Sequence, residues 1–586
     1  MPDEEDSYAL TLAGVDKHFR AGKRTVDALH GVDLKVCRGA VTGLIGPDGA
    51  GKTTLMRLVA GLLRADSGRI VVLGLDAEHE ALQVQASIGY MPQRFGLYED
   101  LTVQENLDLY ADLQGVPRAS RAPRYEELMH MTGLGPFTRR LAGRLSGGMK
   151  QKLGLACTLV HPPRLLLLDE PTVGVDPVSR RELWAIVYRL VQEQHMTVLL
   201  STAYLDEAER CAEVILLHKG RVLSHGAPGH FSRGLEGRTF AVEVPPGSTK
   251  RSLQTRLSET EGVIDAVIQK EHVRLVLAPG IDAGGFEPLR GLDFRQVKPR
   301  FEDHFITALT GTEPVAVISE DAAPLSAPRR GTDEAVIKVE GLERRFGDFY
   351  AVRDISFEVR RGEVFGLLGA NGAGKSTTFR MLCGLLPASG GELQVAGVNL
   401  RRAPAQARQR IGYMSQKFSL YGALSVAQNL EFFSIAYGLR GRRRGERIAW
   451  ALQAFELGPN RQTTSRDLSL GYKQRLALAC ALMHEPDILF LDEPTSGVDP
   501  LARREFWRRI DALAEAGVTV LVTTHFMEEA EYCDRLAIMA AGEILSLGTP
   551  SQVKAAARTE QQPDPSMQDA FIALIEAHDA SAREAA

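Results

Sequence analysis

Two glycine-rich segments of the chain carry the residue types needed to hold a phosphate group. GPDGAGKT at 46–53 and GANGAGKS at 369–376 both match G-x-x-x-x-G-K-[ST]. The glycines let backbone N–H groups wrap phosphates at a helix start, where unpaired donors and the helix dipole favour anions. We expect Lys52 and Lys375 to reach the β- and γ-phosphates, and Thr53 and Ser376 to give a hydroxyl to Mg²⁺. The other predicted loop residues are Gly46, Gly49, Gly51, Thr54, Gly369, Gly372, Gly374 and Thr377.

Two acidic pairs lie at a fixed distance from these loops. LLLLD at 165–169 and ILFLD at 488–492 read as buried strands that end in a carboxylate. Asp169 and Asp492 are therefore the expected Mg²⁺ partners. The following residues, Glu170 and Glu493, can polarise a water for attack on the γ-phosphate. A solvated acidic surface is the alternative interpretation, and the fixed spacing from the phosphate loop disfavours it.

The elements that must position these groups are also readable. Apolar runs at 41–45 and 364–368 predict a strand before each phosphate loop, and the runs at 55–63 and 379–386 predict a helix after it. A chance glycine-rich turn could explain one such segment, but not two in this strand–loop–helix context.

The chain repeats itself. GPDGAGKTT, IGYMPQRFGLY and LLLLDEPTVGVDP each recur at an offset of 323 residues. A single offset across separate motifs indicates a duplicated domain, with copies at 7–236 and 335–558. Short β-rich runs and one helical run predict a small α+β appendage at 237–310, appended to the first copy. A Pro- and Ala-rich stretch at 311–334 is the predicted linker, and 559–586 the predicted helical tail.

Composition excludes several classes of protein. The 586 residues carry 69 Lys and Arg against 74 Asp and Glu, so no positive surplus favours general nucleic-acid binding. The six cysteines lie singly and read as small core residues of a reducing compartment. No secretory signal and no membrane-spanning run of about 18 to 20 apolar residues is apparent, so any membrane role is expected to depend on a partner. A basic cluster at 439–447 reads as a solvated face, with lipid head groups or RNA as alternatives.

LSGGMKQ at 145–151 and LSLGYKQ at 468–474, between the two motifs of each copy, resemble the signature of ATP-binding cassette (ABC) ATPases. The resemblance covers nearly the whole chain and implies an α/β fold: two tandem P-loop ATPase domains, each with a mixed-sheet core and a helical subdomain. It also implies head-to-tail pairing of the cassettes, with each ATP between the phosphate loop of one and the signature of the other. The signature residues are then Ser146, Gly147, Gly148, Ser469 and Gly471.

The same resemblance assigns further roles. Gln93 and Gln416 match the Q-loop, which contacts metal and attacking water, and Asp176 and Asp499 match the D-loop. Phe19 and Phe346 fall where an aromatic ring stacks on adenine, although an isolated Phe is as often a core residue.

The two copies differ at sites of expected chemistry. His525 matches the family's switch histidine, a donor to the γ-phosphate, and the first copy has Ala203 there. Asp48 stands where the second copy has Asn371, and Leu470 replaces the first signature glycine of the second copy. Head-to-tail pairing would place Ala203, Asp48 and Leu470 in one degenerate site and leave the other competent.

The segments GLYEDLTVQENL and SLYGALSVAQNL are most similar to the corresponding segments in ATPase subunits of bacterial drug-efflux ABC exporters. The resemblance implies ATP and Mg²⁺ as cofactors, two separately encoded integral-membrane permeases as partners, and a cytoplasmic location on the inner face of the membrane. The transported molecule stays open. The alternatives are a tandem ABC translation factor on ribosomes, which would need a long charged linker, and the tandem ATPase of a sugar importer.

Overall fold

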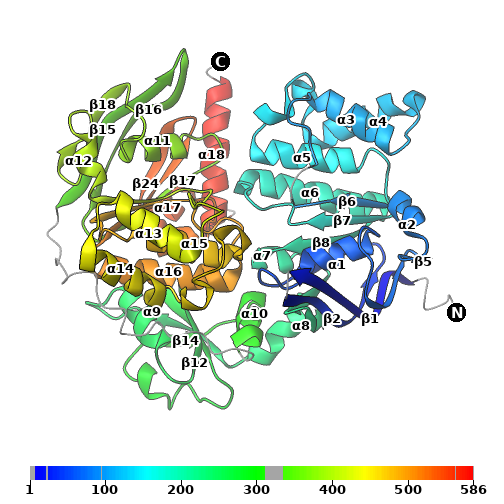
Figure 1. The fold of residues 1–586 in the computed structure, drawn as a ribbon, viewed down its shortest axis with the longest axis horizontal. Helices are drawn as coiled ribbons and strands as arrows, with labels where there is room; N and C mark the ends of the chain where they lie inside the picture. Colours follow the sequence, from blue (N-terminus) through cyan, green and yellow to red (C-terminus); the bar gives the residue numbers. More distant parts are fainter. Residues whose placement is uncertain (1–6, 22–23, 94–95, 311–333, 561, 585–586) are drawn as a thin grey trace. The chain divides into compact units, whose positions relative to one another are not determined.

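The computed structural model of the chain describes residues 7–21, 24–93, 96–310, 334–560 and 562–584. It contains two compact units, Met1–Thr239 with Gln296–Pro314 and Phe240–Arg295 with Val315–Ala586. Except for Glu334, the predicted linker lies outside the described residues. The units are taken in turn (Figure 1).

The first unit is built on two sheets. A four-stranded sheet has the order β2-β1-β4-β5, and a six-stranded sheet has the order β10-β9-β3-β8-β7-β6. In the larger sheet β9, β3, β8, β7 and β6 run parallel and β10 is an antiparallel edge. Every residue of β3 and β7 is buried, as expected for parallel strands covered on both faces. The strands are β1 (Tyr8–Ala21), β2 (Arg24–Cys37), β3 (Val41–Ile45), β4 (Ser67–Val72), β5 (Leu75–Asp76), β6 (Ile88–Met91), β7 (Leu165–Asp169), β8 (Thr197–Thr202), β9 (Glu213–His218) and β10 (Arg221–Gly226).

Three helices of this unit, α3, α4 and α5, lie together in Figure 1, and α5 contacts both α3 and α4. The capping box of Thr102 and Glu105 fixes the start of α3. The helices are α1 (Lys52–Val59), α2 (Ala81–Ser87), α3 (Val103–Leu113), α4 (Arg118–Thr132), α5 (Gly147–Thr158), α6 (Pro177–Gln194), α7 (Leu205–Ala208), α8 (Pro228–Ser232) and α10 (Phe301–Thr310).

The second unit contains the same pair of sheets, with orders β16-β15-β18-β19 and β20-β21-β22-β17-β23-β24. The repeat in the sequence is therefore a repeat of fold, and the α/β class with mixed sheets is confirmed. The strands are β15 (Ala335–Phe346), β16 (Phe349–Arg360), β17 (Val364–Gly369), β18 (Gly390–Val395), β19 (Val398–Asn399), β20 (Ile411–Met414), β21 (Ile488–Asp492), β22 (Thr519–Thr524), β23 (Arg535–Ala540) and β24 (Glu543–Gly548). The helices are α11 (Lys375–Leu382), α12 (Pro404–Arg408), α13 (Val426–Ala436), α14 (Gly441–Ala454), α15 (Leu470–Ala481), α16 (Pro500–Glu515), the 3₁₀ helix η8 (Glu529–Tyr532), α17 (Pro550–Ala556) and α18 (Met567–Glu584).

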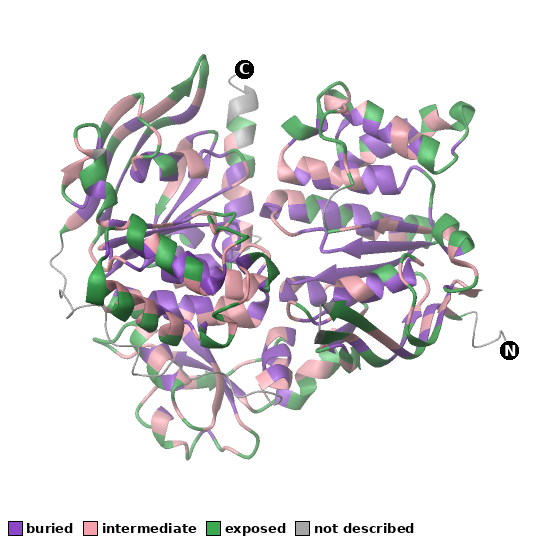
Figure 2. Ribbon diagram, in the orientation of Figure 1, coloured by how far each residue is buried: buried purple, intermediate pink, exposed green. Residues whose placement is uncertain are grey.

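Burial follows the sheets (Figure 2). Separate apolar clusters pack against the two faces of the six-stranded sheet in each copy. Five cysteines are buried in these clusters or beside them. Cys37, the last residue of β2, is half-buried and therefore departs from the prediction that all six cysteines are core residues. Among the described residues no helix is long and apolar enough to span a membrane.

Part of the basic cluster at 439–447 is paired with neighbouring carboxylates. Arg442 pairs with Glu446 at 2.6 Å, and Arg443 and Arg447 pair with Glu485 at 2.8 and 3.4 Å. These pairs occupy three of the five arginines with two carboxylates, so the cluster keeps a positive surplus and the solvated-face interpretation stays a prediction.

The appendage is a four-stranded sheet of order β12-β13-β11-β14 with one covering helix, α9 (Lys250–Ser258). Leu253 and Leu257 of α9 pack into the core of this sheet. Its strands are β11 (Thr239–Glu243), β12 (Val263–Gln269), β13 (His272–Leu277) and β14 (Phe294–Gln296).

Although the appendage follows the first copy along the chain, it packs within the second unit. Arg251 lies 2.8 Å from Asp511 of α16 and 2.9 Å from Asp534, and Asp265 pairs with Arg504 of α16. The aligned positions of the first copy are Tyr188 and Ala212, which carry no carboxylate. The contact surface is therefore particular to the second copy.

Arg251→Ala is expected to weaken this attachment by about 3 kcal/mol, because it leaves Asp511 and Asp534 facing each other without a cation. Burial is the main cause that raises the pKa of Asp511 to about 7, and Arg251 partly opposes it. The folded state therefore loses stability as pH rises through that value, and without Arg251 the loss extends to higher pH.

The measurement is hydrogen exchange in β12 and β13 of the full-length chain as a function of urea and pH. The matched control is Arg256→Ala, an exposed position on the same helix. The role given to Arg251 would be contradicted if the two substitutions had equal effects. It would also be contradicted if the stability lost on Arg251→Ala became smaller above pH 7.

Candidate functional site

Each phosphate loop connects a buried strand to a short helix. β3 leads through the first loop into α1, and β17 leads through the second into α11. Gly51 and Gly374 cap these helices with φ of 106° and 102°, and a Cβ at either would lie 2.5 Å from a backbone oxygen of the strand beside it. Both the conformation and the close packing require glycine there.

The lysines of the two loops are buried and held alike. Lys52 Nζ donates to the Gly46 carbonyl at 2.7 Å, and Lys375 Nζ donates to the Gly369 carbonyl at 2.7 Å. Lys52 Nζ also lies 3.6 Å from Glu170 Oε1. Thr53 and Ser376 follow the lysines in the first helical turn.

The predicted metal carboxylates end β7 and β21 and are fixed by hydroxyls of the next strand. Ser201 donates to Asp169 Oδ1 at 2.7 Å, and Thr523 donates to Asp492 Oδ1 at 2.8 Å. Asp169 Oδ2 is buried and has no hydrogen-bond partner among the described residues. A buried carboxylate oxygen left over beside a hydroxyl-bearing loop suits Mg²⁺, which prefers oxygen ligands, so the residues fit the metal.

The two glutamates that follow stand in a strained backbone conformation. Glu170 has φ 51° and Glu493 has φ 46°, a left-handed conformation that costs a residue with a side chain of the order of 1–3 kcal/mol. The Glu170 N–H donates to the Ser201 carbonyl at 3.1 Å, and that of Glu493 to the Thr523 carbonyl at 3.1 Å. Such strain persists where the surroundings over-determine it, which is common at functional sites.

The Q-loop glutamines contact these glutamates. Gln93 Nε2 donates to Glu170 Oε2 at 2.5 Å, and Gln416 Nε2 donates to Glu493 Oε2 at 2.6 Å. The structure thus brings loop, carboxylates and glutamine together in each copy.

The switch position separates the two copies. His525 Nδ1 lies 3.4 Å from Glu493 Oε2, and its Nε2 is buried and without a hydrogen-bond partner in the described part of the chain. Ala203 in the first copy is buried and offers neither contact. The second copy therefore has a donor beside its glutamate that the first one lacks.

This difference shifts the pKa values of the two glutamates in opposite directions. Burial raises the pKa of Glu170, and Lys52 and Gln93 offset it only in part. Burial acts on Glu493 in the same direction, but His525, Lys375 and Gln416 outweigh it, and the pKa of Glu493 is lowered. Glu493 therefore loses its proton at a lower pH than Glu170.

The signatures begin α5 and α15. Ser146 caps α5 by accepting from the Met149 N–H at 3.3 Å, whereas Ser469 makes no side-chain cap for α15. Gly148 is tightly packed, since a Cβ there would lie 2.3 Å from Ser179 Oγ. Leu470 is the first residue of α15, followed by Gly471.

The remaining assigned residues lie at surfaces or helix starts. Phe19 and Phe346, near the ends of β1 and β15, are 39% and 48% exposed, which excludes the core interpretation of both. Asp176 and Asp499 cap α6 and α16 and accept from backbone N–H groups.

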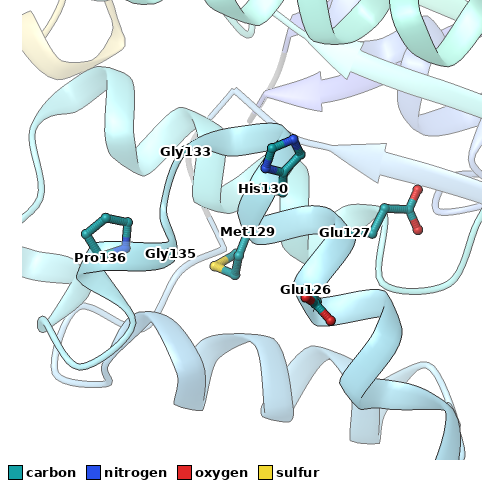
Figure 3. Close-up of a pocket in the computed structure, with 7 residues that line it drawn as sticks. All are labelled: Glu126, Glu127, Met129, His130, Gly133, Gly135 and Pro136. Atoms are coloured by element: carbon teal, nitrogen blue, oxygen red, sulfur yellow. The ribbon is translucent and has the colours of Figure 1, made fainter.

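A hollow of about 630 Å³ lies elsewhere, in the α4 region (Figure 3). In that view Glu126, Glu127 and His130 project from α4, and Pro136 from the turn that follows. It shares no residue with the phosphate-loop site.

Sequence reasoning missed a buried carboxylate in each copy. Glu207, on α7, and Glu529, on η8, are 0% and 1% exposed and accept hydrogen bonds from threonines of the surrounding loops. The signal was present, because DEAE and EEAE recur, each starting three residues after the position aligned with the switch histidine.

Comparisons with known proteins agree with the geometry. A model of the ABC transporter family matches residues 29–173 and 352–496. The chain is 52% identical over 573 residues to the probable multidrug ABC transporter ATP-binding protein YbhF of Escherichia coli (strain K12), covering 97% of each chain. It is 30% identical over 540 residues to a putative ABC transporter ATP-binding protein of Streptomyces avermitilis, covering 90% of this chain and 91% of that one.

Shorter likenesses cover one copy. Nod factor export ATP-binding protein I of Cupriavidus metallidurans is 40% identical over 220 residues, which are 37% of this chain and 73% of that one. A solved structure described as an ATP binding subunit of an ABC transporter matches 41% of this chain and 99% of its own at 28% identity, with a TM-score of 0.38.

Two family matches at the duplicated copies and a full-length likeness of 52% identity agree with the paired phosphate loops, acidic pairs and signatures. The chain belongs to the ABC transporter family, as an ATP-binding ATPase protein with two cassettes.

Proposed function

We propose that this chain is the ATPase subunit of an exporter and acts on the inner face of the cell membrane with two separately encoded permease subunits. The full-length likeness to a probable multidrug ABC transporter ATP-binding protein carries this proposal. The likeness to a Nod factor export protein supports the direction of transport. The names of these relatives support drug efflux as the process that this chain powers. They favour neither a role on ribosomes nor a role in sugar import.

The helical subdomains offer surfaces suited to such partners. Tyr98 before α3 is 56% exposed, and the aligned Tyr421 before α13 is 49% exposed. Tyr421 and Phe432 pack edge to face with ring centroids 4.4 Å apart, and Ile435 is exposed on the same helix as Phe432. Exposed apolar clusters of this kind mark protein interfaces, so we assign them to the permeases.

We further propose that the cassettes pair head to tail and that their two ATP sites are unequal. The first site combines Lys52 and Glu170 with the signature that contains Leu470, and the second combines Lys375, Glu493 and His525 with Ser146 and Gly148. The first site then binds ATP and turns it over slowly, while the second carries most of the turnover. The contrast between His525 and Ala203 supports this division.

Mg²⁺ would be held in each site by the carboxylate and the loop hydroxyl, with the Q-loop glutamine beside them. The residue sets are Asp169, Thr53 and Gln93, and Asp492, Ser376 and Gln416. When bound, the ion neutralises charge on the β- and γ-phosphates. Phe19 and Phe346 are the proposed adenine contacts, and their exposure supports this.

The experiment is purification of a tagged chain from membranes, followed by native mass measurement of the complex. One copy of this chain is expected with two permease subunits, because both cassettes lie on one chain. A Phe432→Asp variant is expected to lose the permeases, since it buries a charge in the apolar contact. Asp substitution of Leu82, exposed on α2, serves as the control. Two copies of this chain per complex, or membrane binding without any permease, would contradict the proposal.

A further inference from the structure

A buried carboxylate beside the second ATP site connects two loops that the proposed chemistry needs. Thr495 Oγ1 donates to Glu529 Oε1 at 2.5 Å, and Thr524 Oγ1 donates to Glu529 Oε2 at 2.5 Å. Thr495 is two residues after Glu493, and Thr524 immediately precedes His525. One side chain therefore holds the backbone next to the water-polarising glutamate and the backbone next to the switch histidine.

The Thr524 hydroxyl also shapes the turn that carries the histidine. Thr524 Oγ1 accepts the N–H of Phe526 at 3.0 Å while it donates to Glu529. These two bonds bracket His525, whose ring stacks on Phe526 with centroids 4.7 Å apart. Phe526 in turn lies beneath Arg503 of α16 at 4.0 Å, and Arg503 Nε lies 3.9 Å from Glu529 Oε1.

The first cassette has a related connection. Both hydroxyls bond the same oxygen there: Glu207 Oε2 accepts from Thr172 at 3.0 Å and from Thr202 at 2.6 Å, and the Tyr204 N–H donates to Thr202 Oγ1 at 3.0 Å. The other oxygen, Glu207 Oε1, accepts from Trp184 Nε1 at 3.0 Å. Ala203 occupies the position of the histidine in this turn. The first cassette therefore keeps the buried glutamate but lacks the histidine that this glutamate would position.

A buried carboxylate that serves only as filler is costly, and packing alone could be supplied by an apolar residue. Instead, a hydroxyl from the last residue of β22 and a hydroxyl from the turn after β21 each bond one oxygen of Glu529, which fixes the distance between these two segments. We propose that Glu529 is a positioning residue that holds His525 and Glu493 in register, so that donor and water-polarising group act on one γ-phosphate together. The inference rests on the proposed competent site in the second cassette.

Thr524→Val tests it with a side chain of the same shape that lacks the hydroxyl. The full-length chain is expected to lose about tenfold in kcat for ATP, because the histidine turn loosens, a misplacement of the kind that lowers rate more than binding. KM for ATP is expected to stay within about twofold, since the phosphate loop with Lys375 is untouched. Thr524→Ser restores the hydroxyl and is expected to recover most of kcat, and Thr495→Val is expected to reproduce the loss from the other side.

The matched variant in the first cassette is Thr202→Val, which we expect to lower kcat less, because Ala203 donates nothing that needs positioning. If Thr202→Val lowers kcat tenfold and Thr524→Val does not, the connection stands and the assignment of the competent site falls. If neither lowers kcat, or if Thr524→Ser is as slow as Thr524→Val, Glu529 is not a positioning residue. A rise in KM equal to the fall in kcat would likewise reduce its role to general support of the fold.

Discussion

Glu493→Gln is expected to lower the steady-state ATPase rate of the full-length chain by about 10² to 10⁴-fold, the range typical of losing a general base. Glu493 has a lowered pKa and contacts both Gln416 and His525, so it can accept from and orient a water at neutral pH. The amide of Gln keeps the size of the side chain and removes its charge. ATP is still bound by Lys375, so the variant should hold the cassettes closed on ATP.

Glu170→Gln is the matched substitution, and more than half of the rate is expected to remain. The pKa of Glu170 is raised mainly by burial, and the switch position of this cassette is Ala203 in place of a histidine. Steady-state phosphate release at saturating ATP measures both variants. If Glu170→Gln is as inactive as Glu493→Gln, either both sites must hydrolyse ATP for turnover or the degenerate site has been assigned to the wrong cassette.

Much of the fold was accessible from the sequence, because its determinants are local and repeated. The apolar runs at 41–45 and 165–169 are the fully buried strands β3 and β7, and the loop between strand and helix is fixed by glycines with positive φ. The offset of 323 residues carried the assignments of the phosphate loop, the glutamine and the acidic pair from one copy to the other. The candidate site followed from the same spacing, and the phosphate loop, acidic pair and glutamine of each copy do lie together.

What the sequence could not provide depends on contacts between residues far apart in the chain. The appendage packs in the unit of the second cassette through Arg251, although nothing at 237–310 indicates which copy it contacts. The opposite pKa shifts of Glu170 and Glu493 depend on the full set of neighbours and not on the local motif. The repeated EEAE segment marks Glu529 but does not show what it binds, since one of its two threonine donors, Thr495, lies 34 residues away in the chain.

His525→Ala should have an effect comparable to that of Glu493→Gln, and it should also change the pH dependence. Loss of one donor aimed at developing charge costs about 10² to 10³-fold in rate. His525 is the first of the groups that overcome the effect of burial on Glu493, and without it the surroundings of Glu493 become like those of Glu170, whose pKa is raised. A carboxyl with a higher pKa becomes ionised only at higher pH, so the acidic limb of the kcat profile should move upward.

The measurement is kcat for ATP as a function of pH in the wild type, His525→Ala and Ala203→His. The last variant adds a histidine to the first cassette, where Glu170 offers the same partner that Glu493 gives to His525. Its effect on rate is expected to be small, because under head-to-tail pairing Leu470 still faces that site. If His525→Ala lowers the rate but does not move the acidic limb, His525 does not control the pKa of Glu493. The histidine would then act only as a hydrogen-bond donor to the γ-phosphate. An Ala203→His variant that doubles the rate would show that the missing histidine, and not Leu470, limits the first site.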